Sequence, residues 1–471
     1  MSETLTGQSV SELAPLIEQK KLSPIELTKA LLDRVEQLNP TVNAYIHIDE
    51  ESAMQAAKRA EADIAGGGYR GPLHGIPLAL KDIFFMEDKV STMGSKIHKD
   101  FVGGYDATVI TKLKNAGAVL TGTLNMHEYA WGGTTNNDHF GACRNPWDLE
   151  RIPGGSSGGS GAAVAADMAF ASLGTDTAGS VRIPASICGI VGLKPTHGRV
   201  SKHGCFPLSW SLDHIGPMTK TVSDAAILLQ AIAGYDAEDP TTLKAPVPQY
   251  TEFLTEDIRG LVIGVEEDYF FHNVDPDVAA AIRQGIETLR ALGAVIKPVS
   301  IPSLKHTLFA EYATVLGESG AIHHHSMKTR PLDFGENVRH SLGYAHLPSA
   351  VDFVMAQQIR RKLALEFESA YTQCDVIVAP TLPIAASKIG ESFEDLNGAK
   401  ANIDVELIRF TPPANLTGMP SLSVPCGFKG GLPVGMQIMG KPFDEGTLLK
   451  VGYAFEKATN FPAKKPALTV A

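Results

Sequence analysis

The chain has few features that would direct it to a membrane or to an oxidising compartment. Its five cysteines form no CxxC pair and are widely scattered, which argues against zinc sites and a disulfide framework. No uninterrupted apolar stretch is long enough to span a bilayer, and residues 1–22 lack the apolar block of a secretory signal. The sequence therefore predicts a cytoplasmic protein with reduced thiols and no membrane partner.

Clustered positive charge is also missing. The formal net charge is −11, and no basic run or basic helical stripe stands out. Because phosphate contacts need clustered Lys and Arg, we expect no nucleic-acid partner. The run His323-His324-His325 suggests a metal site, but consecutive helical residues point about 100° apart and cannot all face one ion. No metal and no cofactor is expected.

The composition favours one large globular unit. Apolar residues make up 44% and charged residues 20% of 471 positions, without an abrupt shift along the chain. A length of ~150 residues per domain would allow about three domains, but the even texture fits a single domain over 1–471 equally well. Within it we distinguish N-terminal helices (1–65), a central part (70–225), a variable part (230–370) and closing strands (371–471).

Local patterns indicate alternating helices and strands. Ser9 with Glu12, and Ser23-Pro24 with Glu26, are typical of capping boxes at helix starts. Short apolar runs around 76–84, 117–125 and 262–267 follow helical segments and are typical of buried strands. The pattern predicts an α/β fold with a large central mixed sheet covered by helices on both faces.

The segment 154–195 is dense in Gly, Ser, Thr and Ala, and it contains the sequences GGSSGGS and GTDTAGS. Glycines at this density let backbone N–H groups converge on a phosphate or a developing oxyanion. A P-loop needs a lysine after its glycines, and none is present. The formal G-x-S-x-G match at Ser156 is not preceded by a strand-like segment, and its candidate partners Asp213 and His214 have no diagnostic context, so an α/β-hydrolase is rejected.

Lys81 lies inside the apolar run 76–84. Burial disfavours a charged amine, so the pKa of Lys81 should fall toward the range of a useful base. Taken alone, this segment favours a different interpretation, in which Lys81 pairs with Asp82 or lies at the wet end of the strand.

Several motifs together decide between these interpretations. GIPLALKD, PGGSSGGSGAA, GTDTAGSVRIPAS, GLKPTHGRVS and DHIGPM occur in that order, and the C-terminal LTGMPSLSVPCGFKGGLPVGMQIMG follows. The sequence thus resembles the amidase signature family nearly from end to end. Ser156 and Ser180 lie 24 positions apart, as the two family serines do.

The resemblance implies a role for each matching residue. Ser180 is the expected nucleophile, Ser156 (after a cis peptide bond) the proton relay, and Lys81 the base. The backbone around Thr177, Ala178 and Gly179 is the expected oxyanion hole. A supporting role is expected for Ser157, and for Asp176 and Arg182 as an ion pair that holds the loop. Residues near the acyl pocket of relatives correspond to Met126, Tyr129 and Trp131, while Cys188 is expected to be a packed core thiol.

The substrate is the less determined part. Tyr269-Phe270-Phe271 and Val351 to Met355 in the variable part favour a hydrophobic or aryl amide, with ester or carbamate side activity. The expected protein is a stand-alone amidase with a small molecule as its partner, and a homodimer, common among relatives, would fit.

The alternative is the glutaminase A subunit of glutamyl-tRNA amidotransferase. In that protein an aspartate before the FTxPANLxG segment receives the glutamine amino group, and Ile408 stands there in this chain, with Asp404 and Glu406 nearby. A second alternative is a non-catalytic binding protein on the same fold.

Overall fold

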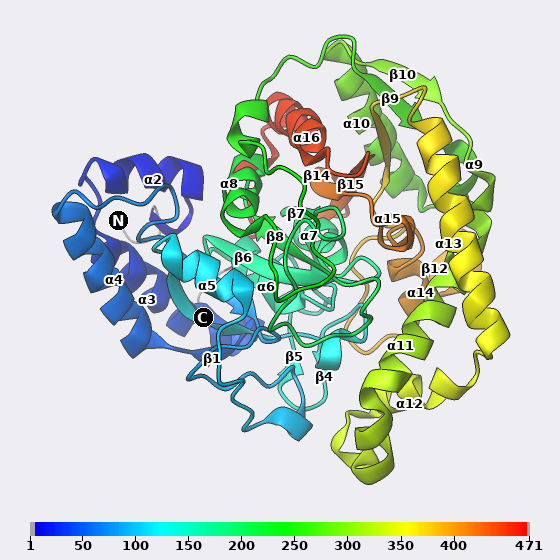
Figure 1. Ribbon diagram of the computed structural model, residues 1–471. Coiled ribbons are helices and arrows are strands. Elements are labelled where there is room, and N and C mark those ends of the chain that lie inside the picture. Colours follow the sequence, from blue (N-terminus) through cyan, green and yellow to red (C-terminus); the bar gives the residue numbers. More distant parts are fainter. Residues whose placement is uncertain (1–4, 469–471) are drawn as a thin grey trace.

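The structure is a computed structural model, and it describes residues 5–468. Its centre is an 11-stranded sheet that contains both parallel and antiparallel pairs (Figure 1). In spatial order the strands are β1 (Tyr45–Ile48), β3 (Val119–Leu124), β2 (Pro77–Lys81), β6 (Ala171–Asp176), β8 (His214–Thr219), β7 (Val191–Lys194), β14 (Ser421–Lys429), β15 (Leu432–Gly440), β11 (Val376–Pro380), β9 (Val262–Val265) and β10 (Val295–Pro298). Two short hairpins, β4–β5 (Asn136–Asn137, Gly141–Ala142) and β12–β13 (Phe393–Leu396, Ala399–Asn402), stand apart from it.

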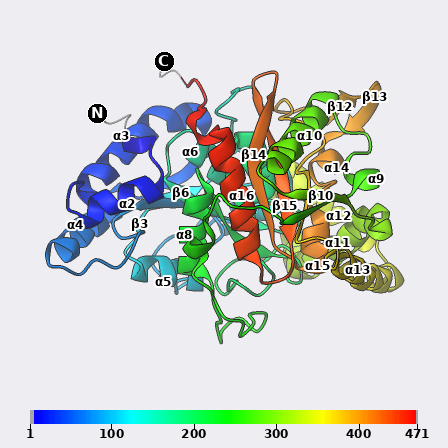
Figure 2. The same ribbon diagram turned by 90° about the horizontal axis from the view of Figure 1, so that it is seen from above.

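Helices pack on both sides of this sheet (Figures 1 and 2), which confirms the predicted α/β architecture. They are α2 (Val10–Glu18), α3 (Pro24–Val42), α4 (Glu50–Ala65), α5 (Thr108–Asn115), α6 (Gly158–Ala165), α7 (Arg182–Cys188), α8 (Val222–Ile232), α9 (Glu267–Phe270), α10 (Pro276–Ala291), α11 (Thr307–Thr329), α12 (Glu336–Gly343), α13 (Ala350–Ala370), α14 (Ile403–Leu407), α15 (Pro412–Thr417) and α16 (Glu445–Thr459). Within the described part of the chain, no helix is long and apolar enough to cross a membrane.

The sequence predicts two capping boxes near the N-terminus. The structure confirms the first, and it confirms the second only in part. Ser9 and Glu12 form the predicted capping box of α2, with reciprocal side-chain bonds. Ser23 caps α3 by accepting from two backbone N–H groups. The predicted reciprocal bond, in which the Glu26 carboxylate accepts from the Ser23 N–H, is absent from the described part of the chain. The Ser23 hydroxyl donates to Glu61 on α4.

Two neighbouring parallel strands bring the site segments together. β2 and β6 are buried along their whole length and pair in parallel, with Leu80 opposite Leu173. Because parallel strands end at the same edge of a sheet, Lys81 at the end of β2 lies beside Thr175 and Asp176 at the end of β6. Sheet topology therefore places the lysine next to the glycine-rich loops that flank β6 in sequence.

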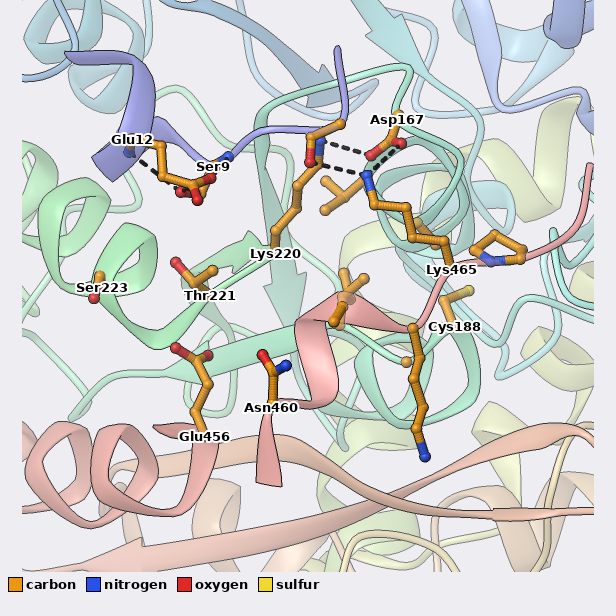
Figure 3. Close-up of a pocket in the computed structure, with 18 of the residues that line it drawn as sticks. Ser9, Glu12, Asp167, Cys188, Lys220, Thr221, Ser223, Glu456, Asn460 and Lys465 are labelled. Atoms are coloured by element: carbon orange, nitrogen blue, oxygen red, sulfur yellow. Dashed lines mark hydrogen bonds and ion pairs between the residues drawn. The ribbon is translucent and has the colours of Figure 1, made fainter. Parts of the chain in front are cut away.

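The two ends of the described chain meet around a cavity of about 400 Å³ (Figure 3). Asp167 pairs there with Lys220 at 2.7 Å and with Lys465 at 3.0 Å. Lys220 also donates to the backbone carbonyl of Gln8 at 3.2 Å. This cluster ties the N-terminal and C-terminal segments to the body of the protein, and none of its residues belongs to the expected triad.

We expect Asp167→Asn to lower the free energy of unfolding by about 2 kcal/mol, because it leaves the mostly buried Lys220 ammonium without a counter-charge. Chemical denaturation followed by circular dichroism measures this. Asp257→Asn, which removes one half of the exposed Asp257–Arg259 pair, is the matched control and should change little. Equal stability of the two variants would contradict the role given to Asp167.

Candidate active site

Lys81 is fully buried and bonds two hydroxyl groups. Its Nζ donates to Ser156 Oγ and to Thr175 Oγ1, each at 2.7 Å. Asp82 does not pair with it, because its carboxylate accepts from Thr92. Burial lowers the pKa of Lys81 to about 7, although nearby acidic groups act in the opposite direction. The lysine can therefore be neutral near physiological pH, as a base must be.

Ser156 lies in a bend between loop and helix. The Gly155–Ser156 peptide bond is cis, as the resemblance implied. The Ser156 carbonyl accepts from His127 N at 3.0 Å, which fixes the loop on its other side. Residues 150–153 form no strand ahead of it, so the strand-to-helix elbow of an α/β-hydrolase is not present at this position.

Ser180 lies in the loop that follows β6 and is 7% exposed. Between residues 5 and 468, no hydrogen bond joins the Ser156 and Ser180 side chains. Ser157 connects the two serine segments instead: its N–H donates to the Ser180 carbonyl at 3.3 Å, and its hydroxyl bonds both backbone groups of Thr175 at 3.2 Å. Ser157 therefore bridges β6 and the Ser180 loop, and its supporting role in catalysis stays a prediction.

Asp176 and Arg182 form a buried ion pair across the Ser180 loop. Arg182 Nε and Nη2 donate to the two Asp176 oxygens at 3.0 and 2.9 Å, and both side chains are fully buried. Burial alone would raise the pKa of Asp176, but the charge and hydrogen bonds of Arg182 outweigh it and lower the pKa to about 2. A bidentate pair of this kind fixes loop geometry as well as charge.

The expected oxyanion donors are not equivalent. The Gly179 N–H donates to Asp176 Oδ1 at 2.9 Å, so it is engaged in this conformation. The N–H groups of Thr177, Ala178 and Ser180 remain as candidates. Gly179 has φ of +128°, and a Cβ there would lie 2.3 Å from Thr411 Oγ1. Only glycine fits this position without displacing the chain.

Three neighbours of the site do not stand out in the sequence as functional residues. Thr175 accepts from Lys81, Thr411 donates to the Ala178 carbonyl, and Asn415 bonds both Asp176 (2.8 Å) and Arg182 (2.6 Å). Thr411 and Asn415 belong to the FTPPANLTG segment, more than two hundred positions from the serines. Its resemblance to a conserved-looking segment of the family was a signal that could have pointed to them.

The three expected pocket residues take different environments. Met126 is fully buried, and its carbonyl accepts from Asn137. Tyr129 packs in an aromatic cluster, with His323 4.5 Å away between ring centroids, and shares a 2.7 Å hydrogen bond with His98. Trp131 is half-buried. Their contact with a substrate stays a prediction.

His323 is buried against Tyr129, while His324 and His325 are exposed. The three histidines point apart, as helix geometry requires. In residues 5–468 no group of three or more His, Cys, Asp or Glu side chains could hold a metal ion.

If this segment held the acidic residue that the family aspartate provides, Asp404 or Glu406 would have to supply it in place of Ile408. Ile408 packs against an apolar cluster that includes Leu382 and Leu407. Glu406 pairs with Arg409 at 3.0 Å, and Asp404 is exposed. None of these residues therefore presents a free, buried carboxylate.

A buried lysine, two serines and a glycine-rich donor loop on one mixed sheet define an amide-hydrolysing serine enzyme of the amidase class. The Amidase family pattern matches residues 26–449. The chain therefore belongs to the amidase signature family, whose members are hydrolases acting on amide C–N bonds.

Individual relatives indicate which members of the family this chain is similar to. The A subunit of the glutamyl-tRNA(Gln) amidotransferase of Carboxydothermus hydrogenoformans is 42% identical over 98% of this chain and 99% of its own. The solved A subunit of the same enzyme from Thermotoga maritima is 37% identical with a TM-score of 0.82, covering 96% of this chain and 95% of its own. A protein from a complex described as vestigial, and as revealing the origins of an s-triazine catabolic enzyme, is 33% identical with a TM-score of 0.92, covering 96% and 98% of the chains.

The expected hydrophobic or aryl amide substrate is wrong, since relatives at 42% identity over nearly the whole chain carry the name of an amidotransferase component. The apolar residues that suggested this substrate lie in the core or on the surface of the protein. Phe270 is buried against Phe410. Val351 and Val354 are 67% and 54% exposed on the surface of α13. Apolar sequence in the variable part thus reports core packing and surface, and says little about a substrate.

The expectation of a small molecule as sole partner, without nucleic acid, is also corrected. The relatives are components of an enzyme named for a tRNA substrate. The charge of −11 describes only the surface of this chain. In a complex, another chain can supply the phosphate contacts. The net charge of this chain alone therefore does not exclude a nucleic-acid partner.

We expect Arg182→Met to lower the free energy of unfolding by about 3–5 kcal/mol at pH 7, because it strands the buried Asp176 carboxylate. The folded pKa of Asp176 lies below its usual 3.8, so the stabilisation is complete above that pH and is lost as pH falls through about 2. Thermal melts from pH 7 to about 2 measure it. Arg283→Met removes an exposed pair with Glu267 and should cost less than about 1 kcal/mol; a similar loss in both variants would contradict the argument.

Proposed function

We propose that this chain is the amide-hydrolysing component of a glutamyl-tRNA amidotransferase, and that it releases ammonia from the side-chain amide of glutamine for use by partner subunits. The observation that carries the proposal is 42% identity over 98% of the chain to proteins of that name. A cytoplasmic location is part of the proposal, supported by five cysteines that are all free thiols.

In the proposed first half-reaction, Ser180 Oγ attacks the amide carbon of glutamine. The proton of Ser180 passes to Ser156, while the Ser156 proton moves to neutral Lys81 over their 2.7 Å contact. The carbonyl oxygen gains negative charge and is stabilised by the candidate N–H donors of Thr177, Ala178 and Ser180. The pKa of Lys81 near 7 supports this assignment, because a charged lysine could not accept the proton.

In the next step, the proton returns through Ser156 to the leaving nitrogen, the C–N bond breaks and ammonia departs. A glutamyl ester on Ser180 remains. Water then attacks this ester, Lys81 and Ser156 again take and return one proton, and glutamate leaves with Ser180 restored. Each half-reaction begins and ends with a neutral lysine, so the cycle balances without a cofactor.

Ammonia release from L-glutamine, measured with the chain alone and with its partner subunits, tests the substrate. We expect release by the wild type and a loss of at least about 10⁴-fold in Ser180→Ala and in Lys81→Ala, because the triad acts as a unit. A fluorophosphonate should modify wild-type Ser180, identified by peptide mass. Turnover that survives in Ser180→Ala, or a wild type inactive on glutamine in both assemblies, would overturn the proposal.

The rate should depend on pH through Lys81. Because the neutral amine is the active form and its pKa is about 7, kcat/KM should rise about tenfold per pH unit below 7 and level off above it. Initial rates between pH 5.5 and 9 measure this. A flat profile across that range would show that Lys81 is not the titrating base.

A further inference from the structure

Glu311 on α11 is a buried carboxylate without a protein partner. It is 1% exposed, and within the described chain neither of its two oxygens has a hydrogen-bond partner. Desolvating a carboxylate is costly unless other groups compensate it. Two other buried carboxylates near the site, Asp176 and Asp213, each accept several hydrogen bonds. Glu311 therefore lacks the hydrogen-bond donors that Asp176 and Asp213 have.

The helix of Glu311 is linked to the Ser180 loop through α15. α11 packs against α15 and α13, and the three helices lie together on one side of the molecule (Figure 1). α15 begins after Thr411, which bonds Ala178, and its Asn415 bonds Asp176. The charges of Arg360, Asp176 and Arg182 all influence the Glu311 carboxyl. The helix that carries Glu311 is thus connected to the Ser180 loop through α15.

The cation with the largest effect on Glu311 is committed elsewhere. Arg360 donates to the Leu416 carbonyl at 3.0 Å, to Ser211 Oγ at 2.9 Å and to Gln357 at 2.9 Å. No ion pair joins it to Glu311 in residues 5–468. The arginine lowers the cost of a negative charge there without satisfying its oxygens.

A second glutamate on the same helix shows the contrast. Glu318, two turns further along α11, accepts from Ser209 Oγ at 2.6 Å and from Ser211 N at 3.0 Å. It fastens α11 to the neighbouring loop. Glu311 lies on the same helix and near the same arginine, but within the described chain it makes no such hydrogen bonds.

We propose that Glu311 is a specificity residue whose carboxylate binds an ammonium group of the substrate. This rests on the proposed function, under which the ligand is the α-ammonium of glutamine. An ammonium offers three donors to the two unpartnered oxygens and supplies the missing counter-charge. Burial raises the pKa of empty Glu311 well above its usual range, and a bound cation would favour the ionised form.

Three amides separate the contributions of the ammonium and the carboxylate to recognition: L-glutamine, glutaramate (the same molecule without the amino group) and 4-aminobutanamide (the same molecule without the carboxylate). In Glu311→Gln, which keeps the shape and removes the charge, we expect KM for the two ammonium-bearing amides to rise at least about 30-fold. Turnover of glutaramate should stay within about threefold. Ammonia release measures all three.

Glu318→Gln is the matched control, because it disturbs the same helix without touching the proposed ligand. It should change all three amides by one common factor. If Glu311→Gln also affects all three alike, its role is structural and the proposal is overturned. Circular dichroism melts of both variants confirm that each is folded.

The outcome for glutamine itself can be separated from the outcome for Glu311. A wild type that cleaves 4-aminobutanamide in a Glu311-dependent way but not glutamine keeps the ammonium site and rejects the proposed function. If neither ammonium-bearing amide is cleaved, protection of Ser180 from a fluorophosphonate by 4-aminobutanamide decides. Protection that Glu311→Gln abolishes supports the site, and no protection overturns it.

Discussion

Burial of Lys81 at the end of β2 is the constraint on which the rest of the site depends. Its amine has no carboxylate partner within the described chain and bonds the Ser156 and Thr175 hydroxyls. In water this group would carry a full charge, whereas burial lowers its pKa to about 7. The neighbouring strands exclude water from it. The sheet thus sets the protonation state of Lys81, because burial makes its neutral amine accessible near neutral pH.

The Ser180 loop is held by a second buried feature, the Asp176–Arg182 pair. Both partners come from within seven residues, but the groups that complete their hydrogen bonding, Thr411 and Asn415, come from the closing part of the chain. Removing that segment would leave a local ion pair buried and incompletely bonded. The active site therefore forms only when the two distant parts of the fold meet.

Glu311 adds a further buried carboxyl group to this part of the molecule. The positions that the family resemblance singled out for an acidic residue hold Ile408 in an apolar cluster and Glu406 in a pair with Arg409. The unpartnered carboxyl group of Glu311 nonetheless lies on α11, a helix of the variable part that packs against α15. Under the proposal for Glu311, recognition of a charged substrate therefore resides on an element outside the segment of Ile408.

The sequence by itself determined the α/β class, the capped N-terminal helix, the buried strand of Lys81 and the pairing of Asp176 with Arg182. Each of these depends on local periodicity, on a short motif or on residues close together in the chain. Lys81 shows the limit of such reasoning, because its own segment favoured a pair with Asp82 and only ordered motifs along the whole chain favoured the serines. Tertiary structure alone decided that Asp82 turns to Thr92, that Gly179 lies against Thr411, and that Glu311 is buried without a partner in the described chain. These contacts join residues from separate elements, and their free energy comes from burial, which no single segment of sequence encodes.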